Sequence, residues 1–171
     1  HVHGIVRATA VGHDGAGVSL TAPNPDGQAD AIRRCLAAAG LTPGDVDYVE
    51  GQGTATEQGD AAELAAYAAA FAGRRPVRVG TVKGQVGHFE AASGVAALVK
   101  VLLALRHGTI PGVRNFTRLP DRLAAAPPVE IVAAPTPWPR AATPRRAGVH
   151  NFGYGGGNAH LLVEEFLPPV R

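Results

Sequence analysis

The stretch Val77-Arg-Val-Gly-Thr-Val-Lys-Gly-Gln-Val-Gly-His88, together with the apolar segment 91–106 behind it, decides the fold of this chain. Residues 77–82 are rich in β-branched side chains and predict a strand, and the glycine-rich residues 83–88 predict a loop. Segment 91–106 predicts a helix that is apolar around most of its circumference, and such a helix is normally buried on several sides. A strand, a loop and a helix in this order predict an α/β fold.

The rest of the chain continues this alternation of strands and helices. Strands are expected at 2–11, 46–50, 129–132, 147–152 and 159–166, and helices at 26–39 and 57–72. Asp26 is the expected cap of the first helix, and Gly40 and Gly73 are the expected helix stops. The order implies right-handed crossovers and a largely parallel sheet within a single unit, residues 1–171.

Glycine-rich segments follow three of the expected strands. They are Gly51–Thr56, Lys83–His88 and Asn151–His160, and the first two lie at carboxyl ends of strands, where ligand sites occur in parallel sheets. Glycine allows close backbone approach, and histidine supplies proton-transfer chemistry near neutral pH. Each segment also has a plain structural explanation: a capped loop before a helix, a helix-capping histidine and a tight β-hairpin. His160 lies inside the last expected strand and is expected to be structural.

Composition and charge exclude several classes of protein. The net charge of +2 comes with scattered basic residues, which lack the concentrated basic face of a nucleic-acid-binding protein. Cys35 is the only cysteine, so an internal disulfide and a multi-cysteine zinc site are excluded, and its helical spacing predicts a core residue. No apolar run reaches the roughly 18 residues of a membrane span, and no secretory signal opens the chain, so a cytoplasmic setting is expected. The lack of methionine predicts a fragment, a processed chain or one piece of a larger polypeptide.

In this order, the three glycine-rich segments resemble parts of the C-terminal half of a β-ketoacyl synthase, the ketosynthase domain of type I polyketide synthases. The resemblance extends over nearly all 171 residues. It implies a thiolase-like fold, in which two similar halves build an α-β-α-β-α layered sandwich and this chain is the C-terminal half. The nucleophilic cysteine of that family lies in the N-terminal half, which is absent here.

The resemblance also assigns the candidate site residues. His88 would donate a hydrogen bond to a thioester carbonyl, because the positive end of the following helix favours a neutral imidazole. Lys83 would order the site. Tyr154 and Gly155 would provide the oxyanion-hole amide and the gate to the cysteine. Gln52 occupies a position where the family has another histidine, and an amide cannot take up a proton.

The family reaction is acyl transfer from the phosphopantetheine of an acyl carrier protein to cysteine, followed by decarboxylative Claisen condensation with a malonyl-type extender. The resemblance implies no directly bound cofactor and no metal. The implied partners are the missing N-terminal half, acyl carrier protein and a second copy of the complete domain. Ala55 and Ala61 replace a usual glycine and proline, and Gln52 replaces a histidine, so we expect an acyltransferase that condenses poorly once assembled. The alternative is a non-catalytic ketosynthase-like domain for carrier-protein docking or dimer architecture; the acyl substrate and the oligomeric state stay open.

Overall fold

The computed structural model describes residues 1–15, 17, 19, 21–72, 76–120, 123 and 129–168. Within them the chain forms a six-stranded sheet and a two-stranded ribbon. The strands of the sheet are β1 (Ile5–His13), β2 (Tyr48–Glu50), β3 (Val77–Gly80), β5 (Val129–Ile131), β7 (Arg146–Phe152) and β8 (Gly157–Glu164). The ribbon pairs β4 (Thr109–Ile110) with β6 (Thr136–Pro137), two short strands that the sequence pattern did not predict.

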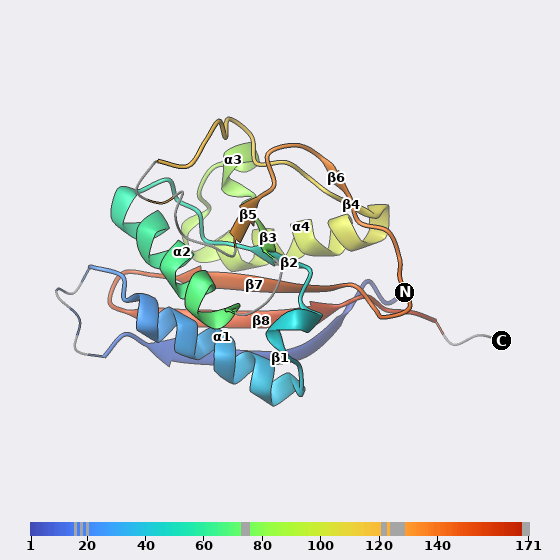
Figure 1. Cartoon of the computed structure of the whole chain (residues 1–171), viewed down its shortest axis with the longest axis horizontal. Helices are drawn as coiled ribbons and strands as arrows, with labels where there is room; N and C mark the ends of the chain where they lie inside the picture. Colours follow the sequence, from blue (N-terminus) through green and yellow to red (C-terminus); the bar gives the residue numbers. More distant parts are fainter. Residues whose placement is uncertain are drawn as a thin grey trace.

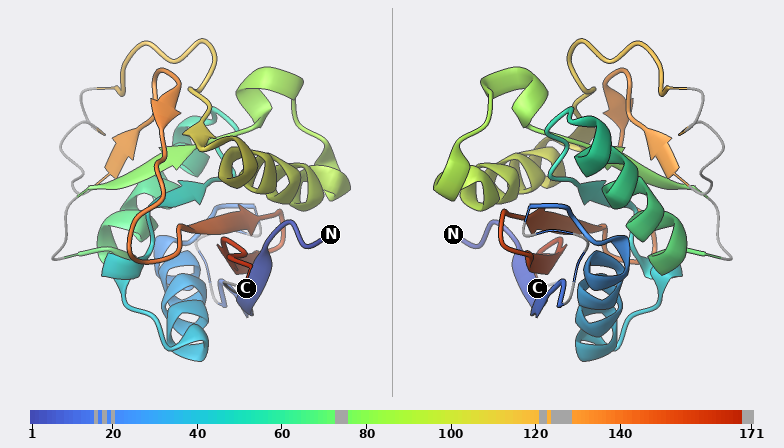
Figure 2. Two further views of the ribbon diagram at one scale, coloured as in Figure 1. Left: turned by 90° about the vertical axis from the view of Figure 1, so that its right-hand side faces the viewer. Right: turned by 90° about the vertical axis from the view of Figure 1, so that its left-hand side faces the viewer.

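The helices cover both faces of the sheet. They are α1 (Pro25–Ala39), α2 (Glu57–Ala70), α3 (Lys83–Val86) and α4 (Ser93–His107), with short 3₁₀ turns at Pro43–Asp45 and Glu90–Ala92. In Figure 1, α1 and α2 lie in front of the sheet. Figure 2 shows α4 on the opposite face. One apolar core lies on each face, around Ile32 and Phe71 on one side and around Val101 and Trp138 on the other. The predicted α/β fold is confirmed.

The strand order β1-β8-β7-β2-β3-β5 places the loops. Strands β7, β2, β3 and β5 are parallel, whereas β8 pairs antiparallel with both β7 and β1. The expected largely parallel sheet is therefore wrong for the β1–β8–β7 part, because a tight turn rather than a helix connects β7 to β8. Since β2 and β3 are parallel neighbours, the loops that follow them leave the sheet at the same edge.

Local chemistry sets the ends of α1. Asn24, and not the expected Asp26, caps this helix, because the Asn24 side chain accepts a hydrogen bond from the backbone amide of Asp26. Pro25 takes the first helical position, where its missing N–H costs nothing. Gly40 ends the helix in the left-handed conformation, as expected.

Other boundaries also differ from the sequence-based expectation. Residues 83–86 form the short helix α3, although 83–88 was expected to be a loop. Helix α2 begins at Glu57 as expected, and Thr56 caps it, but it ends at Ala70 rather than Ala72. The expected stop, Gly73, lies outside the described residues.

Helix α4 is buried on one face only. Ala97 and Val101 are fully buried, but Val95, Val99 and Leu103 are 66%, 49% and 47% exposed. In the chain by itself the helix is therefore not buried on several sides, since no described segment covers the stripe; burial of the stripe against the missing N-terminal half stays a prediction. No helix in the described part of the chain is both long enough and apolar enough to span a membrane.

Candidate active site

The loops after β2 and β3 bring Gln52 and Lys83 into contact. The Nζ atom of Lys83 donates a hydrogen bond to Oε1 of Gln52 at 3.2 Å. Gln52 is buried, and Lys83 is half-buried at the start of α3. Two of the residues predicted for the site thus touch each other.

A buried carboxylate on α2, that of Glu63, holds the Gln52 loop. Its two oxygens accept hydrogen bonds from the backbone amides of Gln52, at 2.6 Å, and Gly53, at 2.9 Å. The Tyr67 hydroxyl donates a further hydrogen bond to Glu63 at 2.6 Å. Burial raises the pKa of Glu63, and the hydrogen bonds that it accepts oppose this rise. At Gly51 a Cβ atom would lie 2.8 Å from a Glu63 oxygen, so this close approach requires glycine.

A second buried carboxylate, that of Glu50 at the end of β2, holds the Lys83 loop. It accepts a hydrogen bond from the backbone amide of Val82. It also pairs with Nζ of Lys100 at 2.7 Å and accepts a hydrogen bond from the Tyr48 hydroxyl. Sequence reasoning missed Glu50 and Lys100, although Lys100 is the one charged residue within the apolar segment 91–105.

Lys83 lies among these charges. Burial lowers the pKa of Lys83 below the usual lysine range, while the carboxylates of Glu63 and Glu50 act in the opposite direction. The positive charge of Lys100 adds to the lowering. A lysine in this position can orient a polar neighbour and contribute a positive charge beside a developing negative one.

Hydrogen bonds define the tautomer of His88. The backbone amide of Glu90 donates to Nδ1 of His88 at 3.1 Å, and the Ser93 hydroxyl lies 2.8 Å from the same atom. A backbone N–H only donates, so Nδ1 is the acceptor and the proton of the neutral ring is on Nε2. The Nε2–H group of His88 is therefore available as a donor. The role that the resemblance implies, donation to a thioester carbonyl, stays a prediction.

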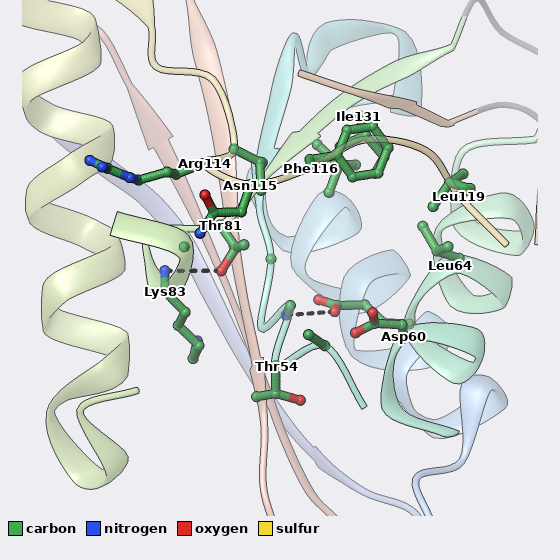
Figure 3. A pocket seen from close by; sticks show the side chains of 18 of the residues that line it. Thr54, Asp60, Leu64, Thr81, Lys83, Arg114, Asn115, Phe116, Leu119 and Ile131 are labelled. Carbon is green, nitrogen blue, oxygen red and sulfur yellow. Dashed lines mark hydrogen bonds between the residues drawn. The ribbon is translucent and has the colours of Figure 1, made fainter. Parts of the chain in front are cut away.

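A cavity of about 480 Å³ is lined in part by Glu63, Lys83 and His88, whereas Gln52 is not among its lining residues. Its polar lining includes Thr54, Lys83 and His88. Its apolar lining consists mainly of Leu64, Val79, Val113, Phe116, Leu119 and Ile131. In Figure 3 Thr54 and Lys83 lie apart from the apolar group formed by Leu64, Leu119 and Ile131. A cavity with both polar and apolar lining can hold an acyl group.

The glycine turn between β7 and β8 is held by the end of β1. The Asp14 amide donates to the carbonyl of Gly156 at 2.8 Å, and Nδ2 of Asn158 donates to the Asp14 carboxylate at 2.6 Å. Gly155 has φ 87°, and the Tyr154 side chain is 90% exposed. None of the described residues 153–157 lines the cavity. Whether Tyr154 and His88 act on one substrate therefore stays a prediction.

The remaining histidine and cysteine candidates are core residues. His160 and His150 are fully buried, with their Nδ1 atoms 3.3 Å apart. Burial lowers the pKa of His150 to about 3, and burial together with His150 lowers that of His160 well below its usual value. Burial also raises the pKa of the Cys35 thiol to about 11, which keeps this cysteine in its unreactive form. Within the described residues, no group of three His, Cys, Asp or Glu side chains could hold a metal ion.

Comparison with known proteins gives consistent matches. Residues 3–117 match the family described as "Beta-ketoacyl synthase, C-terminal domain". The chain is 46% identical to polyketide synthase GfsA of Streptomyces halstedii over 171 aligned positions, in an alignment that covers 97% of this chain and 2% of that protein. It is 44% identical to erythronolide synthase EryA2 of Saccharopolyspora erythraea over 164 residues, which are 94% of this chain and 5% of that protein.

Solved structures give the same picture. The oxazolomycin ketosynthase domain OzmH KS7 of Streptomyces albus JA3453 superposes with a TM-score of 0.94 at 40% identity, over 100% of this chain and 31% of that one. The ketosynthase from module 6 of the bacillaene synthase of Bacillus subtilis 168 gives 0.91 at 37% identity, over 98% and 31%. The chain thus spans about a third of these ketosynthase structures and a far smaller share of the two synthases.

Proposed function

The chain belongs to the β-ketoacyl synthase family, as a C-terminal ketosynthase domain of a type I polyketide synthase, and we propose that it supplies the hydrogen-bond donors of an acyl-transfer site. The observation that carries this proposal is the geometry of His88. Its Nδ1 atom accepts the Glu90 amide, so its Nε2–H group can donate to a thioester carbonyl at the cavity lined by Lys83. The cysteine nucleophile would come from the N-terminal half of the same ketosynthase.

The first chemical step would be acyl transfer. The cysteine thiolate attacks the carbonyl of an acyl thioester on the phosphopantetheine of acyl carrier protein, and the phosphopantetheine thiolate leaves and takes up a proton. Hydrogen bonds from His88 and from the backbone near Tyr154 and Gly155 would stabilise the oxyanion that forms. This step needs no acid–base group at position 52.

The second step, condensation, would depend more on Gln52. A malonyl thioester loses carbon dioxide, and the resulting enolate attacks the acyl-cysteine carbonyl and releases the cysteine thiolate. The enolate oxygen needs hydrogen-bond donors while its negative charge develops. Oε1 of Gln52 accepts the hydrogen bond from Lys83. The Nε2 group of the amide can donate a hydrogen bond, but the amide cannot exchange a proton. We therefore propose that loading is retained and condensation is slow.

A second candidate function is a non-catalytic domain kept for carrier-protein docking or for the architecture of a dimer. The observation that favours it is the groove of about 700 Å³ beside the exposed stripe of α4, lined by Val86, Phe89, Val99 and Leu103. A surface of this kind is typical of one that packs against another part of a protein.

Acyl capture distinguishes the two functions. The full-length synthase is incubated with acyl carrier protein that bears a hexanoyl thioester, and the ketosynthase peptide that carries the cysteine is analysed by mass spectrometry. The proposal predicts a hexanoyl group on that cysteine and its loss after replacement of the cysteine by alanine. An unmodified cysteine in a folded protein that still binds the carrier protein would favour the docking function.

A further inference from the structure

We infer that Lys100 is a positioning residue of the site, which acts through Glu50 to fix the place and the charge of Lys83. This inference rests on the proposed function, since it concerns how Lys83 is held in position in an acyl-transfer site. The chain has sixteen basic residues, of which only Lys83 and Lys100 are lysines. One lines the cavity, and the other lies on the helix behind it.

Lys100 is a buried cation in the middle of the apolar helix α4. Its Nζ atom lies 2.7 Å from Oε2 of Glu50 and donates to the Tyr48 hydroxyl at 2.9 Å. The Tyr48 hydroxyl in turn donates to the same carboxylate. An unpaired charge in such a place is strongly unfavourable, so Lys100 and Glu50 depend on each other.

Glu50 connects this ion pair to the site. Its other oxygen accepts the backbone amide of Val82, the residue immediately before Lys83. Gly51, the residue immediately after Glu50, donates its backbone amide to the Gly80 carbonyl at 2.8 Å. One carboxylate therefore ties the loop that carries Gln52 to the loop that carries Lys83. A hydrogen bond to a charged acceptor is about twice as strong as one to a neutral acceptor, so the charge on Glu50 matters for this contact.

Helix α4 makes a second contact with the site. Ser93 in its first turn lies 2.8 Å from Nδ1 of His88, and Lys100 follows about two turns later. The ion pair between Lys100 and Glu50 fixes α4 against β2, and thereby fixes His88 relative to Lys83. A purely packing role for position 100 would need no charge, because an apolar side chain suits such a place at least as well.

The charges around Lys83 have opposite effects on its pKa. Burial lowers the pKa of Lys83, Glu63 and Glu50 raise it, and Lys100 lowers it by a smaller amount. The other titratable or charged groups near this site are Asp60, Tyr67, Tyr48, His88 and Arg114. Glu50 raises the pKa of Lys83 and Lys100 lowers it. Removing Lys100 alone should therefore raise the pKa of Lys83, whereas removing both charges should lower it.

The test measures the pH dependence of trace reductive methylation of Lys83 in the full-length synthase, by mass spectrometry of its peptide. In Lys100→Met the methylation midpoint should rise by about half a pH unit or more, because a neighbouring positive charge is lost. In Lys100→Met/Glu50→Gln it should fall below that of the wild type, because the stronger raising influence is also lost. Arg106→Met, which removes an exposed cation from the last turn of α4, should leave the midpoint unchanged.

Acyl loading is the second readout. Lys100→Met should lower the maximal loading rate about tenfold or more and leave KM for the acyl carrier protein within about twofold, because Lys100 touches no substrate. A lower Tm with unchanged Lys83 midpoints in both variants would overturn the inference. The double variant Lys100→Met/Glu50→Gln leaves no buried charge unpaired. If Lys100→Met does not fold, the methylation midpoint of Lys83 in the double variant tests the inference. A wild type that never loads an acyl group would refute the proposed function, and the Lys83 midpoints would still decide the role of Lys100.

Discussion

Lys83 donates a hydrogen bond from Nζ to Oε1 of Gln52 at 3.2 Å, and this contact fixes the direction of the Gln52 amide. The carbonyl oxygen of the amide accepts this bond, and the Nε2 group is the only part of the amide that can donate one. Gln52 in this orientation keeps the hydrogen-bonding capacity of a histidine but lacks its acid–base capacity. The contact joins two loops whose residues are 31 positions apart in sequence.

Replacing Gln52 by histidine should raise malonyl decarboxylation by the full-length synthase about tenfold or more, since a positioned acid–base group contributes ~10²–10⁴-fold. The acyl-loading rate should change little, because loading depends on the thiolate and the oxyanion donors. Gln52→Ala is the matched control and should lower decarboxylation further without affecting loading. Fast condensation by the wild type, at a rate unchanged in Gln52→Ala, would show that Gln52 has no role in the reaction.

Ala55 is a strained residue in the Gln52 loop, with φ 60° at a position where the family resemblance predicts glycine. A left-handed backbone is costly for alanine and free for glycine, although glycine loses more entropy on folding. Ala55→Gly should therefore raise the free energy of unfolding by roughly 0.5–1 kcal/mol. Ala65→Gly, on the exposed face of α2, should instead lower it by about 1 kcal/mol. Denaturant titration measures both changes, and a loss of stability in Ala55→Gly would contradict this explanation.

The buried pair His150 and His160 should make the fold sensitive to acid. Burial lowers the pKa of His150 to about 3, so between about pH 6.5 and 3 the unfolded chain binds a proton that the folded chain excludes. The contribution of neutral, buried His150 to the free energy of unfolding is complete above the pKa that this histidine has in the unfolded chain. It is lost as the pH falls below that value. For one histidine the loss between pH 7 and pH 5 is about 2 kcal/mol.

Denaturant titration of wild type and His150→Asn at about pH 7 and pH 5 measures this loss. The variant should lose less stability on acidification than the wild type. His107→Asn is the matched control, since His107 is exposed at the end of α4, and it should behave like the wild type. The explanation fails if His150→Asn and the wild type respond equally to acid.

The exposed stripe of α4 should make the isolated chain self-associate. Val95, Val99 and Leu103 form an apolar surface that extends to Phe89 and Val86. Val99→Glu combined with Leu103→Gln should increase the monomer fraction in size-exclusion chromatography, because a charged surface resists association. Val2→Glu, at an exposed valine outside the stripe, should have a much smaller effect. A monodisperse wild-type chain that unfolds cooperatively would refute this expectation.

Local patterns predicted the elements of this fold better than the contacts between them. Glycines and β-branched runs predicted β2, β3, β7, β8 and the loops after them, since turn chemistry and alternation act over a few residues. The short ribbon β4–β6 was missed, because two-residue strands have no periodicity. The antiparallel pairing of β1 with β8 joins opposite ends of the chain, and no local pattern carries this information.

The candidate site shows the same division. Gln52, Lys83 and His88 could be named from their motifs, and the structure places Gln52 against Lys83. Glu50 and Lys100 also belong to the site, but they lie on a strand and a helix whose sequences predict core segments. The one available signal was a lone lysine in an apolar helix, because a charge in such a place needs a buried partner.

The most direct test of the central claim is a single-turnover measurement on the full-length synthase, with acyl and malonyl carrier proteins supplied together. Acyl occupancy of the ketosynthase cysteine and condensed product on the carrier protein are followed in the same samples by mass spectrometry. We predict that the cysteine becomes acylated quickly and that product forms more slowly by a factor of about a hundred or more, in line with the loss of a positioned acid–base group. Product that appears as fast as the cysteine is loaded, or a cysteine that is never acylated, would contradict the account.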